Sequence, residues 1–376
     1  MRDAVIVDAV RTPIGKRNGS LSTIHPGDLT GHVLGALADR VAFDPADIDD
    51  VVWGCVSQVG DQAGSIGRVG VLAAGWPESV PATVVDRRCG SGQQAVVFAA
   101  AGVIAGHYDI AIAGGVESMS RVPMGSARGD GQPYPASVLD RYGVDGFNQG
   151  LGAEMMAKRW DLSRQVLDEY SARSHERTAA AIDAGAFDAQ LAPIGGLTQD
   201  EGLRRGTTAD KLGGLKTPFD PDGVITAGNA SQISDGAGAL LITSSETASQ
   251  RGWTPIARIH TTVLAGDDPV IMLSAPIAAT AKALTRSGLS IDDIGAFEVN
   301  EAFAPVPLAW QKETGASDAV LNPLGGAISV GHPLGGSGAI LMTRLAHHMR
   351  DNGIRYGLQT MCEAGGMANA TILELL

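Results

Sequence analysis

The chain has 376 residues, of which 44% are hydrophobic and 18% are charged, and its net charge is −13. This composition is typical of a folded protein with a large core and excludes a disordered chain. An acidic chain lacks the clustered positive charge that a nucleic-acid surface needs, so we expect no nucleic-acid partner. No apolar run is long enough to span a bilayer, and we therefore expect no membrane association.

The cysteines and the chain ends bear on the compartment. Cys55, Cys89 and Cys362 form no C-x-x-C pair, and their odd number excludes a complete disulfide framework. Free cysteines are typical of a reducing compartment. The chain starts with a strand-like run instead of a signal segment, and it ends without a peroxisomal tripeptide. We therefore expect a cytoplasmic protein.

Strand-like and helical runs alternate along the first part of the chain. We expect strands at residues 4–10, 51–55, 83–85 and 110–113. Helices are expected between them, at residues 29–40, 66–75 and 93–105. This alternation predicts an α/β sheet with helical crossovers.

The composition changes near Ser118, where the chain becomes rich in Gly, Pro, Arg and Asp. The changed stretch contains two expected helices, at 153–160 and 164–184, the second with Ser163 as its N-cap. We interpret it as a large insertion. Sheet-like sequence resumes afterwards, at residues 239–243 and 256–264.

The last third of the chain resembles the first. In the first part, a turn around Cys89 leads into a helix and then into a strand ending in Gly114-Gly115. In the last part, a strand at 297–300 is followed by the glycine-rich segment 331–338, a helix to Met349 and a strand ending in Cys362. The similar spacing predicts two similar halves. Chance similarity between two ordinary α/β sequences is the alternative.

Cys89 lies in a short Gly/Ser turn before a long apolar helix. A helix N-terminus favours the thiolate over the thiol and offers backbone N–H groups to an oxyanion. A free cysteine is also commonly a small buried hydrophobe. Position alone therefore leaves both interpretations open.

Three further polar residues lie at turns or strand ends. His332 stands in Gly-His-Pro before a glycine-rich turn and a helix expected over 339–349; it could activate a thiol or be bonded within its turn. Cys362 ends a strand and could act as acid and base, fill the core, or pair with Cys89. Asn300 ends another strand and could fix a water or a carbonyl oxygen. Two Cys and one His at these separations match no zinc spacing, so no metal site is predicted.

Four segments together resemble the signature segments of the thiolase family in order and spacing: VDRRCGSGQQA, VNEAFA, NPLGGAISVGHPLGGSGA and MCEAGGMANATI. The resemblance covers the chain from Val5 to Ile372. It implies the α/β thiolase fold, a five-layered αβαβα core of two similar halves with an inserted loop domain that binds coenzyme A. The implied boundaries are residues 1–117 plus about 232–254 for the N-terminal half, 118–231 for the loop domain and 255–376 for the C-terminal half.

The resemblance also implies catalytic roles. Cys89 is the nucleophile that carries the acyl group, and His332 deprotonates it. With a water held by Asn300, His332 also stabilises the enolate oxygen. Cys362 moves the proton at the α-carbon or on the incoming CoA sulfur. Backbone N–H groups of Cys89 and Ala364 form the oxyanion hole, where developing negative charge meets fixed donors.

The resemblance extends to the positions that contact the substrate. Arg204 matches the arginine beside the adenine, and Ser231 matches a position that lines the pantetheine. The alternative for Arg204 is one of two solvated arginines on a polar loop. Three matches fall near the acyl end of the substrate, at Phe219, Met272 and Phe303.

Two departures from the family pattern stand out. Ala364 replaces the first of three glycines, which is tolerable if its φ is negative. The segment 118–149 is shorter than in biosynthetic relatives, and Asn148-Gln149 replaces a His-Met pair there. These differences leave a homodimer or a dimer of dimers open and favour breakdown over synthesis.

We therefore expect an acyl-CoA:acetyl-CoA C-acyltransferase of fatty-acid β-oxidation. It would cleave 3-oxoacyl-CoA with CoA into acetyl-CoA and a shortened acyl-CoA, through an acyl-cysteine, with CoA as a substrate and no permanently bound cofactor. One alternative is an acetoacetyl-CoA thiolase that works in the direction of synthesis. Another is a β-ketoacyl synthase-like enzyme, disfavoured by the second cysteine and the single Gly-His-Pro. The last, a non-enzymatic scaffold, is disfavoured by the intact Cys/His/Cys/Asn set.

Overall fold

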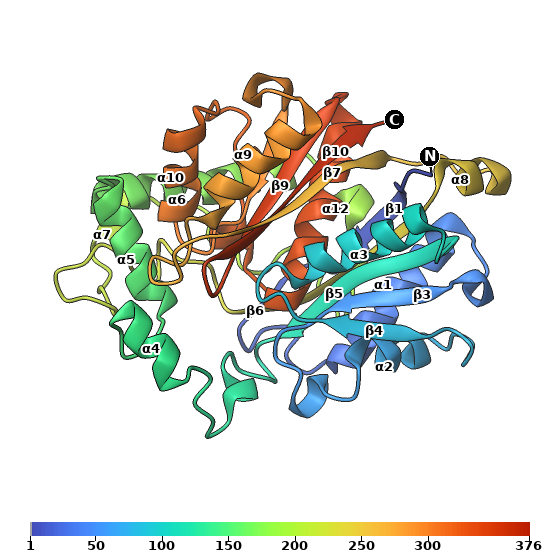
Figure 1. Cartoon of the computed structure of the whole chain (residues 1–376), viewed down its shortest axis with the longest axis horizontal. Helices are drawn as coiled ribbons and strands as arrows, with labels where there is room; N and C mark the ends of the chain where they lie inside the picture. The colour runs from blue at the N-terminus through green and yellow to red at the C-terminus, as the bar shows by residue number, and fades with distance from the viewer. Residues whose placement is uncertain (1) are drawn as a thin grey trace.

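The computed structural model describes residues 2–376, whose strands form one 10-stranded sheet in the order β4-β3-β5-β6-β1-β7-β10-β9-β8, with β2 (Gly15–Lys16) paired to β6. β1 and β7 meet over two residue pairs, Val5 with Arg258 and Ile6 with Ala257. We therefore describe the strands as two sub-sheets that join at this point. In Figure 1 the strands of the first sub-sheet are mostly blue to cyan, and those of the second are yellow-orange to red.

The first sub-sheet is formed by the N-terminal part of the chain and by one strand that returns after the insertion. Its elements are β1 (Val5–Arg11), α1 (Pro26–Val41), β3 (Asp50–Gly54), α2 (Ile66–Ala73), β4 (Ala82–Val85), α3 (Ser91–Ala105), β5 (Ile110–Ser118) and β6 (Ser234–Thr243). β3 pairs in parallel with β4 and β5, whereas β6 pairs antiparallel with both β5 and β1.

The second sub-sheet repeats this pattern. Its elements are β7 (Ala257–Gly266), α9 (Ala275–Ser287), β8 (Ala296–Val299), α10 (Pro305–Thr314), α11 (Ala327–Val330), α12 (Leu334–Asn352), β9 (Tyr356–Glu363) and β10 (Met367–Leu375). β8 is parallel to β9, and β10 is antiparallel to both β9 and β7. The predicted similarity of the two halves is therefore confirmed for four strands of each sub-sheet, and β4 is an additional edge strand of the first.

The helices complete the five layers. α3 and α12 pack against each other and against strands of both sub-sheets, so they form the central layer. α1 and α2 cover the outer face of the first sub-sheet, and α9 covers that of the second (Figure 1). One apolar core lies between the sub-sheets and two lie under the outer helices. The observed order αβαβα is the one predicted.

The central helices approach closely because glycines line their contact. A Cβ atom on Gly92 would lie 2.8 Å from the backbone N of Ala339, and one on Gly338 would collide with the backbone of Gln93. The glycine-rich segment before residue 339 was predicted as a turn, and this prediction is wrong. α12 begins at Leu334, so its glycines are helical. Backbone contact with α3, which no side chain would permit, offsets the low helix propensity of glycine.

The inserted part, between β5 and β6, carries the helices α4 (Ala136–Tyr142), α5 (Gln149–Arg159), α6 (Arg164–Asp183) and α7 (Ala209–Gly213). The predicted N-cap is confirmed, because the Ser163 side chain accepts the N–H of Val166. α4, α5 and α7 lie on the side of the molecule away from the two termini (Figure 1). α8 (Ser245–Arg251) then joins β6 to β7. No helix within residues 2–376 is both long and apolar enough to cross a membrane.

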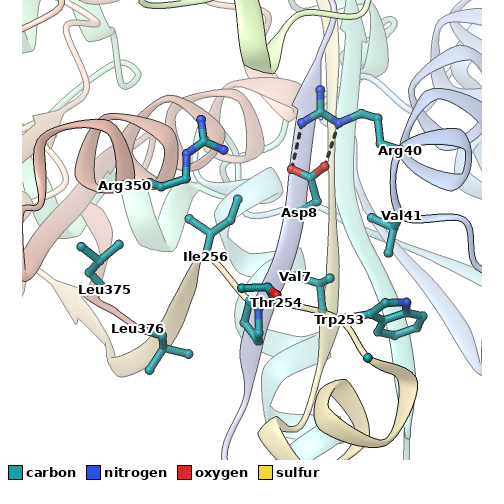
Figure 2. A pocket seen from close by; sticks show the side chains of 12 residues that line it. Val7, Asp8, Arg40, Val41, Trp253, Thr254, Ile256, Arg350, Leu375 and Leu376 are labelled. Atoms are coloured by element: carbon teal, nitrogen blue, oxygen red, sulfur yellow. Dashed lines mark hydrogen bonds and ion pairs between the residues drawn. The ribbon is translucent and has the colours of Figure 1, made fainter.

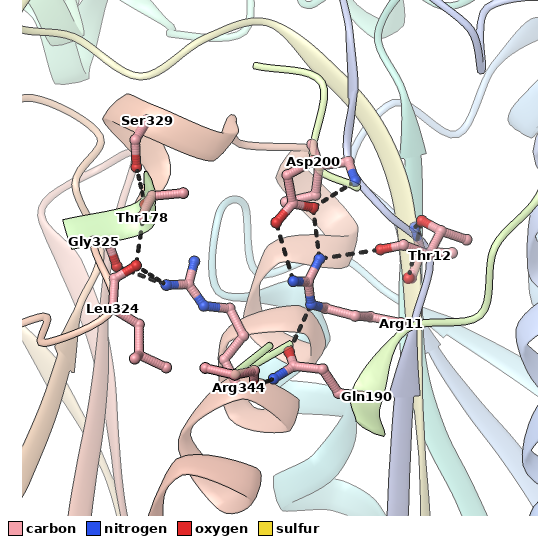
Figure 3. A network of polar contacts seen from close by, with 12 residues as sticks. Arg11, Thr12, Thr178, Gln190, Asp200, Leu324, Gly325, Ser329 and Arg344 are labelled. Atoms are coloured by element: carbon pink, nitrogen blue, oxygen red, sulfur yellow. Dashed lines mark hydrogen bonds and ion pairs between the residues drawn. The ribbon is translucent and has the colours of Figure 1, made fainter. Parts of the chain in front are cut away.

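A buried polar network ties the insertion to the core (Figure 3). Arg11, at the end of β1, donates to both carboxylate oxygens of Asp200, at 2.7 and 3.0 Å, and to Gln190 at 2.7 Å. Arg344 of α12 donates to the carbonyl oxygens of residues 324 and 325, at 3.0 and 2.7 Å. The ring of Phe187 lies 5.1 Å from each guanidinium carbon, so one aromatic side chain contacts both cations.

Candidate active site

Cys89 lies between β4 and α3, with 5% of its surface exposed. The backbone N–H groups of Cys89 itself and of Ala364 lie beside its sulfur and act to lower the pKa of the thiol. Burial raises the pKa of the thiol, and the charges of Cys362 and Glu363 raise it further. The expectation that the helix start favours a resting thiolate is therefore wrong. α3 begins two residues later, at Ser91, and burial outweighs its dipole.

His332 immediately precedes Pro333, the N-cap of α12, and its ring is buried. Its Nδ1 lies 2.6 Å from the Ser337 hydroxyl, and its Nε2 lies 3.4 Å from Nδ2 of Asn300. Its backbone N–H donates to the carbonyl of Gln232 at 3.1 Å and to Ser234 Oγ at 3.2 Å. Burial lowers the pKa of His332 to about 4, so the imidazole is neutral at pH 7 and can accept a proton.

Asn300 connects the histidine to the second thiol. It follows β8, and its Nδ2 lies 3.9 Å from the sulfur of Cys362 as well as near the imidazole. Cys362, near the end of β9, also accepts the backbone N–H of Ala302. Burial raises the pKa of Cys362 to about 12. The fold thus brings His332 and Cys362, which are far apart in sequence from Asn300, to the same side-chain amide of Asn300.

The turn after Cys362 orients a backbone donor towards Cys89. Ala364 does not have positive φ, whereas Gly365 and Gly366 have φ of +96° and +74°. Alanine is therefore tolerated at position 364, as the negative-φ condition required, and its N–H lies beside the sulfur of Cys89. Two N–H groups therefore converge at the nucleophile, which is the geometry that an oxyanion requires. Cys89 and Cys362 are both free thiols, so the disulfide alternative does not hold in this structure.

Two buried carboxylates hold the catalytic segments, and the sequence analysis gave neither a role. Glu301, next to Asn300, accepts hydrogen bonds from Tyr170 and Ser174 of α6, at 2.8 and 2.7 Å, and also from Asn322 and the N–H of Ile328. The insertion is thereby anchored to the loop that carries Asn300.

Glu117, at the end of β5, connects a segment of the N-terminal half with the start of α12 in the C-terminal half. It accepts the N–H of Gly335 in α12 at 2.8 Å and those of Val56 and Ser57 at 3.0 Å, together with Gln62 Nε2 at 2.6 Å. A carboxylate at the start of α12 also opposes the positive end of the helix dipole. The sequence signal was an acidic residue inside an otherwise apolar strand.

Two of the three predicted acyl-pocket residues are in contact. The rings of Phe219 and Phe303 contact edge to face, with centroids 6.2 Å apart. Met272 and Phe303 belong to the same apolar cluster as Cys362. A side chain on Gly150 would collide with the ring of Phe219, so this glycine allows Phe219 to pack on α5. Two of the predicted positions, from separate segments, are thus in contact, and Met272 lies in the same large core as Phe303.

The two candidate CoA contacts differ in exposure. Ser231 is partly buried, and its N–H donates to the carbonyl of Ala302 at 2.9 Å, which places it beside the Asn300 loop. Arg204 is exposed, and its backbone N–H donates to Nδ1 of His175 at 3.2 Å. The neighbouring Arg205 pairs with Asp183 at 2.6 Å. Arg204 is therefore the one of the two arginines whose side chain has no ion pair within residues 2–376.

A hollow of about 480 Å³ lies elsewhere, around Asp8, Arg40, Ile256, Arg350 and Leu376 (Figure 2). It flanks the start of β7, whereas the strand register places Cys362 beside Ala368, which pairs with Ala265 at the other end of β7. The hollow is therefore separate from the thiols. Within the described part of the chain, no group of three or more His, Cys, Asp or Glu side chains could hold a metal ion.

The chain was compared with known proteins. The family profile described as "Thiolase, N-terminal domain" matches residues 4–246, and the one described as "Thiolase, C-terminal domain" matches residues 253–375. The chain belongs to the thiolase family. It is an acyltransferase, and the predicted thiolase fold is confirmed.

Individual thiolases match over the full length. The steroid 3-ketoacyl-CoA thiolase of Mycobacterium tuberculosis is 47% identical, and the match covers 100% of this chain and 95% of the relative. The 3-ketoacyl-CoA thiolase of Erwinia tasmaniensis is 42% identical, and the match covers both chains completely. The crystal structure of the Bacillus anthracis acetyl-CoA acetyltransferase superimposes with a TM-score of 0.91 at 35% identity and covers 100% of this chain and 99% of that one. The scaffold interpretation is thereby overturned.

Proposed function

We propose that this thiolase cleaves 3-oxoacyl-CoA with CoA, and that Cys89, His332, Asn300 and Cys362 carry the reaction. The observation that supports this most strongly is the convergence of these four side chains with the N–H groups of residues 89 and 364. Relatives named 3-ketoacyl-CoA thiolase support the degradative direction.

In the first half-reaction, the Cys89 thiol loses its proton to Nε2 of His332 and the sulfur attacks the C3 carbonyl. The oxygen of the tetrahedral intermediate is stabilised by the N–H groups of Cys89 and Ala364. The C2–C3 bond then breaks, leaving an acyl-Cys89 thioester and the enolate of acetyl-CoA. His332, with a water held by Asn300, stabilises the enolate oxygen, and Cys362 protonates the carbon.

In the second half-reaction, CoA takes the acyl group from Cys89. Cys362 removes the proton of the CoA thiol, and the new sulfur attacks the thioester carbonyl at the same pair of N–H groups. Collapse of the intermediate releases the shortened acyl-CoA and returns Cys89. We propose that coenzyme A is the substrate that enters and leaves, with no permanently bound cofactor.

We propose that the inserted residues 118–231 form the CoA-binding loop domain between an N-terminal half (1–117 plus about 232–254) and a C-terminal half (255–376). In this proposal the exposed Arg204 stacks on the adenine or meets a phosphate. Ser231 lines the pantetheine beside the Asn300 loop, and Phe219, Met272 and Phe303 surround the acyl chain. Three free cysteines support a reducing, cytoplasmic setting.

The experiment is a panel of 3-oxoacyl-CoA substrates of increasing size, including a polycyclic one because one relative is named for steroid substrates. Thiolysis is measured as kcat/KM for each, and condensation of two acetyl-CoA molecules is measured under the same conditions. We expect thiolysis of at least one long or polycyclic substrate to exceed condensation. A protein that condenses acetyl-CoA but cleaves only acetoacetyl-CoA would support the biosynthetic alternative.

A further inference from the structure

Ser337 lies in the first turn of α12 and contacts the imidazole of His332 from the side opposite the thiols. Its Oγ lies 2.6 Å from Nδ1 of His332 and 2.8 Å from the carbonyl oxygen of Pro333. The side chain of Ser337 is buried, with 4% of the residue exposed. A buried hydroxyl in this position affects which ring nitrogen carries the proton.

A hydroxyl has one hydrogen and two partners compete for it here. If Ser337 donates to the Pro333 carbonyl, its Oγ presents lone pairs to the ring, and His332 must carry its proton on Nδ1. Nε2 is then a free base that accepts from Nδ2 of Asn300. If Ser337 donates to Nδ1 instead, the proton lies on Nε2. In the amide orientation in which Nδ2 of Asn300 also contacts Cys362, Nε2–H would face Nδ2 as two opposed donors, and turning the amide would give up the contact with Cys362.

We propose that Ser337 is a positioning residue for His332: its hydroxyl donates to the Pro333 carbonyl and accepts Nδ1–H, which keeps Nε2 free to take the Cys89 proton. This inference rests on the base role given to His332 in the proposed function. In this proposal α12 has a second role in addition to packing against α3. The helix fixes the tautomer of the histidine that precedes it.

The burial of the ring makes this support necessary. Burial is the cause of the low pKa of His332, so forming the imidazolium here is costly. Once Nε2 has taken the thiol proton, Nδ1–H needs an acceptor, and Ser337 Oγ provides it. The titratable groups nearby are the thiols of Cys89 and Cys362 and, behind Gly335, the carboxylate of Glu117.

Loss of the Ser337 hydroxyl would move the proton of neutral His332 from Nδ1 to Nε2. With Ser337→Ala, Nδ1–H has no acceptor, so the Nε2–H tautomer is favoured. The Oδ1 atom of Asn300, which has no hydrogen-bond partner among the described residues, can accept that Nε2–H after the amide turns. Nε2 can then no longer take a proton from Cys89. A catalytic histidine held in the wrong tautomer can lose about 10⁴ in rate, and lost hydrogen-bond support around a site costs about 10- to 100-fold.

The test compares Ser337→Ala and Ser337→Thr with the wild type. We expect Ser337→Ala to lower kcat for thiolysis about 100-fold with little change in the KM for CoA, because the lost contact acts on the chemical step. The rate of alkylation of Cys89 by iodoacetamide, followed against pH, should rise only at higher pH than in the wild type. Ser337→Thr keeps the hydroxyl and should restore both the rate and the pH profile.

Thr343→Val is the matched control. Thr343 lies on the same helix, is buried, and donates to the carbonyl four residues earlier at 2.9 Å, as Ser337 does. We expect Thr343→Val to leave the alkylation profile unchanged. The proposal is overturned if Ser337→Ala keeps the wild-type profile, if Thr343→Val shifts it equally, or if a folded Ser337→Thr is as impaired as the alanine variant. Iodoacetamide needs no acyl-CoA, so these outcomes stand even if the proposed substrate class is wrong.

Discussion

The two thiols differ in the groups that surround each sulfur. The backbone N–H groups of residues 89 and 364 lie beside the sulfur of Cys89. The same two groups can stabilise the oxyanion that forms when this sulfur attacks a carbonyl. Cys362 is contacted by Nδ2 of Asn300 and by the N–H of Ala302, and it lies in the apolar cluster with Met272 and Phe303. These surroundings support the proposal that Cys362 acts at the carbon that gains or loses a proton and Cys89 at the carbonyl.

Replacing Cys362 should separate these roles. Cys362→Ala should still become acetylated at Cys89 by acetyl-CoA, because the nucleophile and its N–H groups remain. It should lose thiolysis and the exchange of acetyl-CoA α-protons with deuterated water by about 10²–10⁴-fold, the usual contribution of a general acid–base group. Peptide mass spectrometry measures the first and NMR the second. Cys55→Ala is the control and should retain both. Exchange at the wild-type rate in Cys362→Ala would transfer the role to His332.

Glu363 gives a pH dependence that can be measured without substrate. Its carboxyl group is fully buried, no described residue donates a hydrogen bond to it, and Nη1 of Arg87 lies 4.0 Å away. Burial raises the pKa of Glu363 to about 8 from 4.5, so the folded protein binds a proton that the unfolded chain releases between these values. The free energy of unfolding should fall as pH rises through this window, by up to about 1.4 kcal/mol per pH unit.

Glu363→Gln keeps the size of the side chain and cannot ionise. It should remove this dependence, so that urea unfolding of the variant at pH 8 requires more denaturant relative to wild type than at pH 5. Glu313, which lies at the surface near Trp160, gives the control variant Glu313→Gln. Equal slopes for wild type and Glu363→Gln would show that the buried carboxyl does not titrate in this range.

At the scale of helices and strands, the sequence predicted which elements exist and in what order more accurately than it predicted the residues at which they begin and end. Alternating apolar runs predicted the strands and helices, since that signal depends on burial. The start of α12 was missed because Gly335, Gly336 and Gly338 indicate a turn in any local analysis. Their helical state depends on contact with α3, which is more than 200 residues away in the sequence. The same reason hid Ser337, whose hydroxyl gains its role only once the helix starts before it.

The buried network of Arg11 gives a prediction for the anchoring of the insertion. Asp200→Ala would leave the guanidinium of Arg11, which has no exposed surface, without a counter-charge. Removal of one partner of a buried pair commonly costs about 3–5 kcal/mol. We expect that loss in urea unfolding, and faster proteolysis of the insertion. Asp183→Ala removes a carboxylate from an exposed pair with Arg205 and should leave stability almost unchanged, because solvent screens exposed ion pairs. Equal effects would contradict the anchoring role.

For the whole molecule, the family motifs predicted the layers and the four proposed catalytic residues together. Cys89, Asn300, His332 and Cys362 were named from segments with fixed spacing. The contact of Asn300 with Cys362 follows from the pairing of β8 with β9, whereas its contact with His332 depends on where α12 begins. The carboxylates Glu117 and Glu301 could not be assigned in this way. Each joins elements from different parts of the chain, so its role exists only after the halves and the insertion have assembled.

The free edge of the first sub-sheet leads to a prediction about assembly. β4 is the terminal strand, so one side of its backbone has no partner within the described chain. α3, which packs against β4, carries two exposed apolar side chains, Phe98 at 48% and Ile104 at 44%. An unpaired strand edge beside exposed apolar side chains is typical of a surface that pairs with another chain. We propose that two copies of this chain associate through β4 and α3, as a homodimer or as the unit of a dimer of dimers.

Sedimentation velocity tests this assembly. The wild type should sediment as a dimer or a larger even oligomer, and Phe98→Asp should shift it to the monomer, because a carboxylate buried in the interface would be desolvated without a partner. Leu151→Asp is the matched control, since Leu151 is 42% exposed on α5 and lies outside the proposed interface. We expect it to leave the oligomer intact. The residues before Cys89 belong to the same edge, so the monomeric variant should also lose thiolysis as the turn holding the nucleophile loosens. A wild-type monomer would contradict the assembly, and a Phe98→Asp variant that stays associated would place the contact elsewhere.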